Sequence, residues 1–464
     1  MTSTCGRDTT GRTLTFLVTA MSGCQERLSE VCRRPRSHRL NTREPTMDKP
    51  LAGIRILDLT HVWAGPLATR VLGDMGAEIL KIETATARGL RDMRIPIPGM
   101  YPGGDPKDEF WNRDGEFNKL NRNKKGLSLN LKSDEGKAIF LSLVAKCDVV
   151  IENFSASAMN RLGLGYDSLK GANPQIIYVA MPGFGTSGPN SDFVAFGPSV
   201  EPMTGLTAMM GYRDDEKYTT AMGLPDPIAG ITAAAAVVTA VAQRKETEQG
   251  QHIDLPLQEG TINLLGEKYV EAQLTGHAPA VNANRSTSFA PQGIYPCAGE
   301  DEWIVIACPN DETWGALAGI AGIHNSGFET VEARQQHHDA LDERISAFTS
   351  GCSKLELMVQ LQDAGVPAGA VHTAPEVLSD PQVRARNYFV EMGGEHIEPS
   401  PYPGTPVRFD RQRATSWQLA PKLGEHNEEV LRDLLGLSNA EISRLEEDGV
   451  IAKLPPTIEE ARRR

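Results

Sequence analysis

An aspartate stands between two prolines at the start of a long run of small apolar residues. The stretch "MGLPDPIAG" covers residues 222–230, and "ITAAAAVVTAVAQR" follows it. A residue before proline is disfavoured in the α region, and proline suits the first position of a helix. We therefore expect Asp226 to be an N-cap that binds the N–H groups of Ile228 and Ala229, with its charge favoured by the helix dipole. The local pattern leaves two roles open for Asp226: a helix cap or a catalytic carboxylate.

A basic cluster, "NRNKKG", precedes a run of alternating apolar residues and contains Arg122, Lys124 and Lys125. Its basic groups fit a solvated loop, and they also fit a partner for phosphate groups, because ammonium and guanidinium groups form strong charge-assisted hydrogen bonds with phosphate. Residue types alone do not decide between these two interpretations.

Several other chemistries are disfavoured. The first strand-like run is followed by "THVWAGP" rather than a glycine-rich dinucleotide turn, and the chain has no P-loop, GxSxG or HExxH motif. Seven cysteines without CxxC or Cys/His ligand spacing indicate a reduced, cytoplasmic protein without a metal site. The net charge of −13 argues against nucleic acid or an anionic membrane as a partner. We expect the apolar run after Asp226 to be too short and too weakly apolar to cross a bilayer.

Strand-like and helix-like segments alternate from residue 52 onward. Strand patterns occupy residues 53–59, 77–83, 126–131, 148–154 and 174–181, and helical patterns occupy residues 67–76 and 133–147. This alternation predicts an α/β fold with a parallel sheet covered on both faces. Ligands of such sheets bind beyond the carboxyl ends of the strands. That crevice should be lined by "THVWAG", "ENFSAS" and "PGFGTSGP".

The chain divides into four parts by composition. Residues 1–46 are basic and lack periodicity, so we interpret them as a disordered extension or an over-called start before Met47, with a transit or signal peptide as alternatives. Residues 47–274 form the first part of a large domain, and its Gly/Pro-rich loop between residues 85 and 120 is long enough to be functional or mobile. Residues 275–385 predict a smaller domain of paired strands and helices. Residues 386–464 return to the large domain.

The ordered motifs resemble those of one known family. They include "LAGIRILDLTHVWAGPLATRVLGDMGAEILKIE", "NRNKKGLSLNLKSDEGK", "DVVIENFSASAMNRLGLGYDSL", "GLPDPIAG", "GVPAGAVHTAPEVLSDPQVRAR" and "LGEHNEEVLRDLLGLS". Together they are similar to the class III CoA-transferases, the group of formyl-CoA and carnitine CoA-transferases, over residues 50–450. The resemblance implies a large Rossmann-like parallel-sheet domain built from both chain ends, a smaller α+β domain, and an interlocked homodimer. It also implies a cytoplasmic enzyme that holds no permanent cofactor and uses acyl-CoA and a carboxylic acid as substrates.

The resemblance further implies a role for individual residues. Asp226 matches the family's nucleophile, which forms an acyl-aspartyl anhydride and then an aspartyl-CoA thioester. The turn after the first strand matches the contact with the pantetheine and acyl group, and three further segments match contacts with adenosine and phosphate. The positions carried over to coenzyme A are His61, Val62, Trp63, Ala64, Leu129, Asn130, Leu131, Lys132, Asn153, Phe154, Ser155 and Arg161.

Departures from formyl-CoA transferase bear on the substrate. Trp63 stands where that enzyme has glutamine, and Val194 and Phe196 replace a lysine and a tyrosine. These changes predict a less polar pocket than one for oxalate.

Two isomerase alternatives remain. The family's racemases pair a histidine with the aspartate, and residues 193–202 contain none. Intramolecular CoA transfer would use Asp226 covalently. A third alternative is a catalytically idle binder of acyl-CoA.

Overall fold

The computed structural model describes residues 49–84, 98–105, 109–212, 216–395, 397–409 and 417–454. The predicted extension 1–46 and much of the Gly/Pro-rich loop therefore lie outside the described residues. Residues 49–464 form one compact unit. The predicted domain boundaries at 274 and 385 remain predictions.

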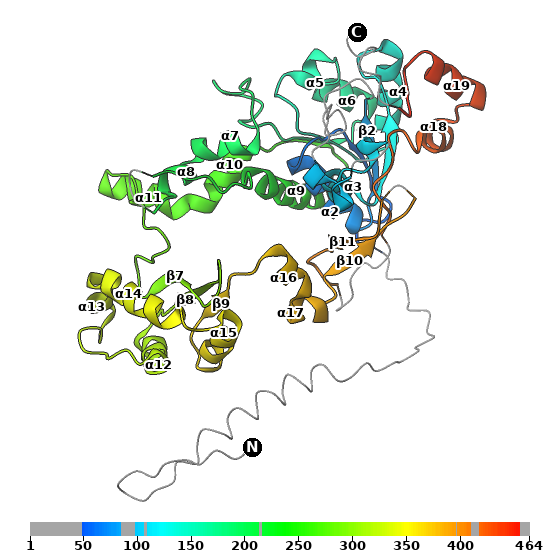
Figure 1. The fold of residues 1–464 in the computed structure, drawn as a ribbon. Coiled ribbons are helices and arrows are strands. Elements are labelled where there is room, and N and C mark those ends of the chain that lie inside the picture. The colour runs from blue at the N-terminus through cyan, green and yellow to red at the C-terminus, as the bar shows by residue number, and fades with distance from the viewer. Residues whose placement is uncertain are drawn as a thin grey trace, which may run out of the picture. The chain divides into compact units, whose positions relative to one another are not determined.

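A six-stranded parallel sheet forms the centre of the α/β part (Figure 1), with the strand order β3-β2-β1-β4-β5-β6. The strands are β1 (Arg55–Asp58), β2 (Glu78–Glu83), β3 (Lys124–Ser128), β4 (Val149–Glu152), β5 (Ile177–Ala180) and β6 (Gln251–Asp254). The strand order reverses between β1 and β4, which pair in parallel. Ligands of such sheets bind at this switch point, because the loops after the two strands diverge there and leave a crevice.

Helices cover both faces of the sheet, as the alternating pattern predicted. One face packs on α2 (Ala64–Asp74), α9 (Pro225–Thr247) and α10 (Leu257–Ile262). The other face packs on α4 (Asp134–Val144), α6 (Tyr166–Ala172), α18 (Asn427–Leu435) and α19 (Asn439–Glu447). Further helices are α3 (Gly115–Asn121), α5 (Ala158–Arg161), α7 (Gly197–Val200), α8 (Leu206–Met209) and α11 (Gly266–Thr275).

Two elements begin or end elsewhere than predicted, and several others, among them β6 and α3, were not predicted. Helix α2 begins at Ala64, within the predicted turn, because Pro66 is tolerated in the first turn of a helix. Strand β3 ends at Ser128 rather than at residue 131, because its partner β2 ends at Glu83, opposite Ser128. The edge strand β6 has a polar, half-exposed sequence and α3 lies in the Gly/Pro-rich loop, so neither gave a clear pattern.

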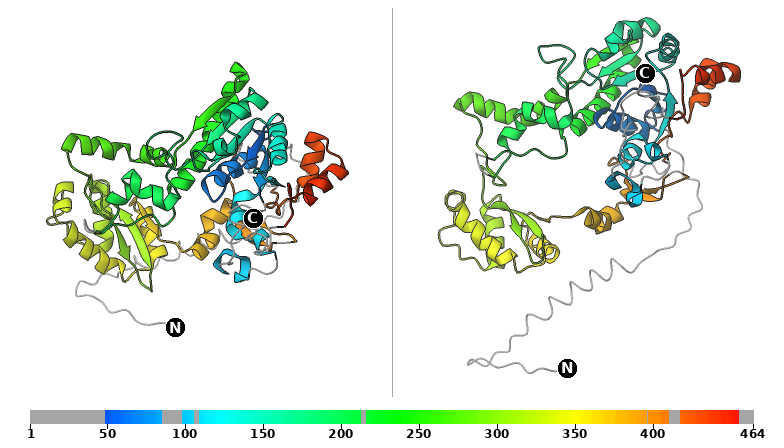
Figure 2. Two further views of the ribbon diagram at one scale, coloured as in Figure 1. Left: turned by 90° about the horizontal axis from the view of Figure 1, so that it is seen from above. Right: turned by 45° about the horizontal axis from the view of Figure 1, so that its top comes forward.

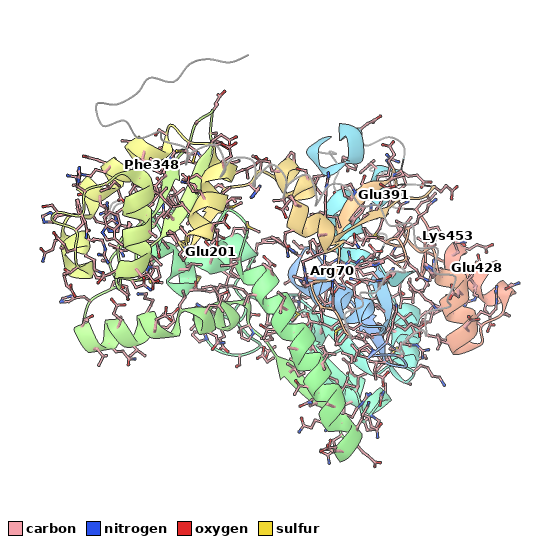
Figure 3. All side chains as sticks on the ribbon, turned by 90° about the horizontal axis from the view of Figure 1, so that it is seen from below. Arg70, Glu201, Phe348, Glu391, Glu428 and Lys453 are labelled. Atoms are coloured by element: carbon pink, nitrogen blue, oxygen red, sulfur yellow. The ribbon has the colours of Figure 1, made fainter. Side chains whose placement is uncertain are left out.

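The C-terminal segment returns to the first part of the large domain. Backbone N–H groups at the edge of β3 are satisfied from this segment: Gly126 N donates to His426 Nδ1 (3.1 Å), and Ser128 N donates to Asn427 Oδ1 (2.8 Å). Helices α18 and α19 lie beside this edge in both Figure 1 and Figure 2. Glu428 and Lys453, labelled in Figure 3, form an ion pair of 2.9 Å. The segment thus covers a sheet edge that would otherwise be open.

A second core lies between residues 292 and 370. Strands β7 (Gln292–Pro296), β8 (Trp303–Ala307) and β9 (Ala368–Ala370) form an antiparallel sheet. The buried Trp314 anchors its hydrophobic core. The helices of this region are α12 (Asp311–Ala321), α13 (Val331–Gln336), α14 (His338–Thr349) and α15 (Lys354–Asp363). Helices α16 (Ala374–Ser379) and α17 (Pro381–Ala385) follow, and then the hairpin β10 (Phe389–Met392) and β11 (Ser400–Pro403).

Helix α9 departs from the expectation about membranes. It extends to Thr247, and by length and composition alone it could cross a bilayer, contrary to the prediction that the run is too short and too weakly apolar. Half of its apolar window is buried inside the protein, and the core helices of water-soluble proteins pass the same test. This helix is the one element of the described residues that passes it.

Candidate active site

Asp226 does not cap its own helix. Helix α9 begins one residue earlier than expected, at Pro225, and Asp226 occupies its first turn. The N–H group of Ile228, one of the two donors that the cap prediction named, bonds to the Leu224 carbonyl oxygen instead (3.3 Å). The side chain instead accepts backbone hydrogen bonds from Ala64 and Gly197, the first residues of α2 and α7. The starts of three helices therefore meet at one carboxylate, and each favours its negative charge.

The carboxylate fits closely against glycine. A Cβ atom on Gly197 would lie 1.9 Å from Asp226 Oδ2 and 2.9 Å from the Gly223 carbonyl oxygen, so position 197 has no room for a side chain. One turn later on the same face of α9, a Cβ on Gly230 would lie 2.6 Å from the Ala64 carbonyl oxygen. This close approach of α9 to α2 brings Asp226 to the Ala64 N–H group. The sequence analysis had not identified Gly197.

Burial dominates the electrostatics of Asp226. The residue is 8% exposed, and this burial raises the pKa of its carboxyl to about 6. The hydrogen bonds from Ala64 and Gly197 oppose the shift, and the nearby Glu116 carboxylate adds to it. The expectation that helix dipoles keep this group fully ionised is therefore corrected, because the loss of hydration outweighs the donors. A carboxylate with this pKa is still largely ionised at neutral pH.

The turn after β1 closes the switch point through reciprocal hydrogen bonds. His61 N donates to Asn153 Oδ1 (2.8 Å), and Asn153 Nδ2 donates to the His61 carbonyl oxygen (2.7 Å). The His61 ring stacks on Phe154, with centroids 5.5 Å apart. Burial, assisted by Lys81, lowers the pKa of His61 to about 3, so this ring is neutral. The next residue, Val62, has a φ of 64°, a left-handed conformation that is strained for a β-branched side chain.

A buried charge network lies beneath this turn. Asp58 accepts hydrogen bonds from Lys124 Nζ (2.9 Å), Thr69 Oγ1 (2.7 Å) and Thr60 Oγ1 (2.5 Å). Although burial opposes it, the ammonium groups of Lys124 and Lys81 hold the pKa of Asp58 well below its usual range. The Lys81 ammonium also donates to the Thr60 carbonyl oxygen. The network thus links β1, β2, β3 and α2 at the base of the turn.

Arg122 and Lys124 of the basic cluster have structural roles. For these two residues, both interpretations, a solvated loop and a partner for phosphate groups, were wrong. Arg122 is fully buried, forms an ion pair with Asp74 (2.6 Å) and stacks on Trp417. Lys124 is fully buried against Asp58. Lys125 is half-buried and pairs with acidic side chains rather than standing free in solvent. Their partners are distant in the sequence, which explains why the local pattern did not reveal the pairing.

The other positions assigned to coenzyme A are scattered around the strand ends. Leu129 is fully buried and Leu131 packs on the same core, so their side chains belong to the interior. Asn130 N donates to the Val450 carbonyl oxygen (2.8 Å), and Lys132 is exposed. These residues form a turn after β3 rather than a strand end. Their assignment to coenzyme A remains a prediction.

Ser155 and Arg161 lie together on the other side of the switch point. Arg161 NH2 donates to Ser155 Oγ (3.3 Å), and Arg161 also donates to Ser157. Ser157 Oγ in turn donates to Asp192 Oδ1 (3.0 Å). Arg161 is exposed at the end of α5, so its guanidinium is accessible to an anion.

Helix α3 contributes residues that the sequence analysis did not assign to the site. Glu116 lies close enough to raise the pKa of Asp226, and Lys119 Nζ lies 5.5 Å from the centroid of the Trp63 ring. The expectation of a less polar pocket did not foresee these charged groups beside Trp63. In the part of the chain that the structure describes, no group of three His, Cys, Asp or Glu side chains could hold a metal ion.

Comparisons with known proteins place this chain in a family. The sequence pattern of CoA-transferase family III matches residues 51–427, and the chain therefore belongs to CoA-transferase family III. This finding confirms the resemblance and the expected class of enzyme, an acyl-CoA:carboxylate CoA-transferase.

Individual relatives agree with this class. The chain is 33% identical to succinyl-CoA–D-citramalate CoA-transferase of Chloroflexus aurantiacus, over 87% of this chain and 98% of the relative. It is 31% identical to succinate–glutarate CoA-transferase of Agrobacterium fabrum, over 84% of this chain and 97% of the relative. The crystal structure of a CAIB/BAIF family protein from Brucella suis matches with a TM-score of 0.74 and 29% identity, and it covers 84% of this chain and 100% of that chain.

We predict that Gly197→Ala displaces the Asp226 carboxylate and reduces CoA transfer by at least roughly a hundredfold, because small displacements of reacting groups have effects of this size. Steady-state CoA transfer between an acyl-CoA and a carboxylic acid would measure the loss. Gly171→Ala is the matched control, because a Cβ at that helical position meets no atom within 4 Å. Full activity of Gly197→Ala would contradict the proposed contact.

We predict that Asp226→Asn stabilises the fold at neutral pH more than at acidic pH. The folded-state pKa of about 6 lies above the usual 3.8, so the folded protein loses stability as pH rises from about 4 through 6. The asparagine variant lacks this loss, which amounts to about 3 kcal/mol at pH 8. Chemical denaturation at several pH values would measure the difference. A gain that does not vary with pH would contradict it, and Asp192→Asn, at an exposed aspartate, is the control.

Proposed function

We propose that this enzyme moves coenzyme A from an acyl-CoA to a carboxylic acid through covalent intermediates on Asp226. The observation that carries the proposal is the buried carboxylate held by the N–H groups of Ala64 and Gly197 at the switch point. A nucleophile must be fixed, ionised and shielded from water. Asp226 meets these requirements, since it is 8% exposed and its pKa is about 6.

The reaction proceeds through four acyl transfers. An oxygen of Asp226 attacks the thioester carbonyl. The C–S bond breaks, coenzyme A leaves as a thiolate, and an acyl-aspartyl anhydride is formed on the enzyme. The thiolate then attacks the aspartyl carbonyl and releases the donor acid, which leaves an aspartyl-CoA thioester. The acceptor carboxylate attacks the carbonyl of this thioester, the C–S bond breaks, and the thiolate is released from a second, acceptor-aspartyl anhydride. The thiolate finally attacks the acceptor carbonyl, which yields the new acyl-CoA and free Asp226.

The same N–H groups can serve the intermediates. When the thiolate or the acceptor attacks the aspartyl carbonyl, negative charge develops on the carbonyl oxygen, within the carboxyl group to which Ala64 and Gly197 donate in the resting enzyme. Fixed backbone donors at such an oxygen lower the barrier without reorganisation. Coenzyme A would approach along the turn His61–Ala64, with Asn153, Phe154 and Ser155 beside it and Arg161 toward its phosphates. The exposed position of Arg161 supports this direction.

We also propose that the enzyme acts as an interlocked homodimer in the cytoplasm. Large apolar side chains are exposed near the site and on α11, among them Phe193, Phe196 and Leu274, which are 53%, 59% and 82% exposed. Apolar side chains exposed in this way are typical of a surface that a second subunit covers.

The free, mostly buried cysteines of the described residues suit a reducing compartment, and cell fractionation against a cytoplasmic marker would test that location.

We predict that light scattering gives twice the chain mass of 50.4 kDa. Leu274→Glu should shift the mass toward the monomer, because it places a charge on an 82% exposed apolar side chain within the expected interface. Val305→Glu, on the separate antiparallel sheet, is the comparison at another exposed apolar residue. A monomeric wild-type protein that retains full transfer activity would exclude the dimer proposal.

We predict that an acyl-CoA followed by hydroxylamine converts Asp226 to a hydroxamate. Hydroxylamine attacks an anhydride or thioester carbonyl, and the tryptic peptide of residues 218–244 would carry the product in a mass spectrum. The labelling rate should rise with pH around an apparent pKa of about 6, because the ionised carboxylate is the nucleophile. Asp226→Asn is the negative control.

Two other outcomes of this experiment favour other functions. Exchange of the α-hydrogen of the acyl group with solvent, without labelling of Asp226, would favour a racemase. Binding of acyl-CoA with neither labelling nor exchange would favour an idle binder. Either result would exclude covalent CoA transfer through Asp226.

A further inference from the structure

The turn that precedes Asp226 is tied to a buried carboxylate. Glu201, labelled in Figure 3, is 0% exposed and lies in η5 (Glu201–Thr204), a short 3-10 helix that follows α7 without a break. Its Oε1 atom accepts a hydrogen bond from Thr220 N (2.8 Å), and its Oε2 atom accepts one from Thr220 Oγ1 (2.6 Å). Both carboxylate oxygens therefore hold one residue of this turn, and we call the two bonds the Glu201–Thr220 clasp.

The Glu201 end of the clasp is anchored by other helices. Thr204 Oγ1 donates to the Glu201 carbonyl oxygen (2.7 Å) within η5. The Tyr269 hydroxyl of α11 donates to the Thr204 carbonyl oxygen (2.5 Å), and Gln258 Nε2 of α10 donates to the Met203 carbonyl oxygen (2.8 Å). These bonds fix η5 to two neighbouring helices, so the buried carboxylate is an acceptor with a fixed position.

The segment between Thr220 and Asp226 contains two residues in the left-handed region. Ala221 has a φ of 56° and Gly223 a φ of 60°. Glycine adopts this conformation freely, whereas the Cβ atom of alanine makes it unfavourable, so it persists only where the surroundings hold it. The Gly223 carbonyl oxygen in turn accepts a hydrogen bond from Asp226 N (3.0 Å). The clasp therefore holds one end of a strained turn, and the other end of that turn contacts Asp226.

The other side of the clasp also leads to the Asp226 carboxylate. Gly197, which donates to that carboxylate, stands at the start of α7, and α7 continues directly into η5 and Glu201. A Cβ atom on Gly197 would lie 2.9 Å from the Gly223 carbonyl oxygen, so the start of α7 and the end of the turn are in close contact. Asp226 is thus held from two sides, by α7 and by the turn, and the clasp joins these two supports.

We propose that the Glu201–Thr220 clasp positions the nucleophile: it fixes the turn at residues 220–223 against α7 and so sets the direction of the Asp226 carboxylate. The two residues act through this turn and helix, and the substrate is bound by other groups. This inference rests on the covalent role of Asp226 proposed above. A carboxylate suits such a task, because hydrogen bonds to it are shorter and stronger than those between neutral groups. Small displacements of a reacting group have large effects on rate.

The test measures the rate of hydroxamate formation on Asp226 as a function of pH and of acyl-CoA concentration. Succinyl-CoA, acetyl-CoA and benzoyl-CoA are tried with the wild-type enzyme, and the fastest donor is used for every variant. Thr220→Val removes the hydroxyl donor at nearly constant shape, and Thr220→Ser keeps that donor. Glu201→Ala removes both acceptors, and Glu201→Gln removes the charge but keeps an acceptor oxygen.

Thr373→Val is the matched control for Thr220→Val. Thr373 N and Thr373 Oγ1 donate to the Glu376 carboxylate (2.7 and 2.9 Å), so the same two groups of a threonine bind a glutamate. This pair caps the start of α16 and has no part in the contacts that hold Asp226. The variant therefore loses a hydrogen bond of the same kind at another place in the chain, and we expect it to label like the wild-type enzyme.

We expect Thr220→Val to lower the maximal labelling rate roughly tenfold, because the reacting carboxylate is displaced. The acyl-CoA concentration for the half-maximal rate should stay within about twofold of the wild-type value, because substrate binding is not changed. The pH midpoint of labelling should rise by about half a unit, because the Gly197 N–H bond that lowers the pKa of Asp226 becomes weaker. The charged neighbour Glu116 of α3 stays in place.

The remaining variants separate the hydrogen bonds from the charge. Glu201→Ala should show a lower rate and a higher midpoint than Thr220→Val, because both bonds of the clasp are lost. Thr220→Ser and Glu201→Gln should retain most of the wild-type rate and midpoint, because each can still form the clasp. Thermal melting shows whether each variant is folded, and Thr220→Val keeps the test valid if Glu201→Ala does not fold.

Three results would overturn the proposal. A lower melting temperature with an unchanged rate and midpoint in Thr220→Val would show that the clasp stabilises the fold and does not position Asp226. A loss in Glu201→Gln as large as that in Glu201→Ala would assign the effect to the charge instead of the two hydrogen bonds. Absence of labelling in the wild-type enzyme with every donor would reject the nucleophile itself, whereas failure of the clasp alone leaves wild-type labelling intact.

Discussion

The fully buried Asp58 carboxylate is the interaction on which the site depends. It lies at the end of β1 and binds Lys124 of β3 and Thr69 of α2, while Lys81 of β2 lies 3.8 Å away. A carboxylate without these partners would be too costly to bury. The network therefore fixes the ends of three neighbouring strands and one helix relative to each other. Lys124 Nζ also donates a hydrogen bond to Asn121 Oδ1 (2.9 Å), at the end of α3. The elements that carry Trp63, Ala64, Glu116 and Lys119 are thus joined by one set of charges.

Close backbone packing completes the site from the other direction. Gly230 allows α9 to approach the Ala64 carbonyl oxygen, and Gly197 allows α7 to approach the Asp226 carboxylate. Neither glycine has a positive φ, so their role is space rather than backbone freedom. Because a Cβ at either position would meet another atom within 3 Å, the geometry of the carboxylate follows from the absence of side chains at these two positions.

Sequence reasoning predicted the parts of the structure that depend on local pattern. The buried strands β1, β2, β4 and β5 and the helix after Asp226 follow from apolar runs, helical spacing and proline chemistry. The rest depended on distant partners. Lys124 looked like a solvated or phosphate-binding residue because Asp58, 66 positions earlier, gives no local signal. Asp226 looked like a cap because its donors belong to α2 and α7. Helix α3 was missed because its seven residues lie in a Gly/Pro-rich loop.

Burial places opposing demands on Asp226. It removes water that would hydrolyse the proposed acyl-aspartyl anhydride, and it makes the remaining hydrogen bonds stronger. It also disfavours the ionised form, which is the nucleophile in the proposed mechanism. The donors from Ala64 and Gly197 limit this penalty, so the pKa of about 6 leaves most of the carboxylate ionised at neutral pH. In the proposed mechanism, acylation of Asp226 also removes the repulsion between its charge and Glu116.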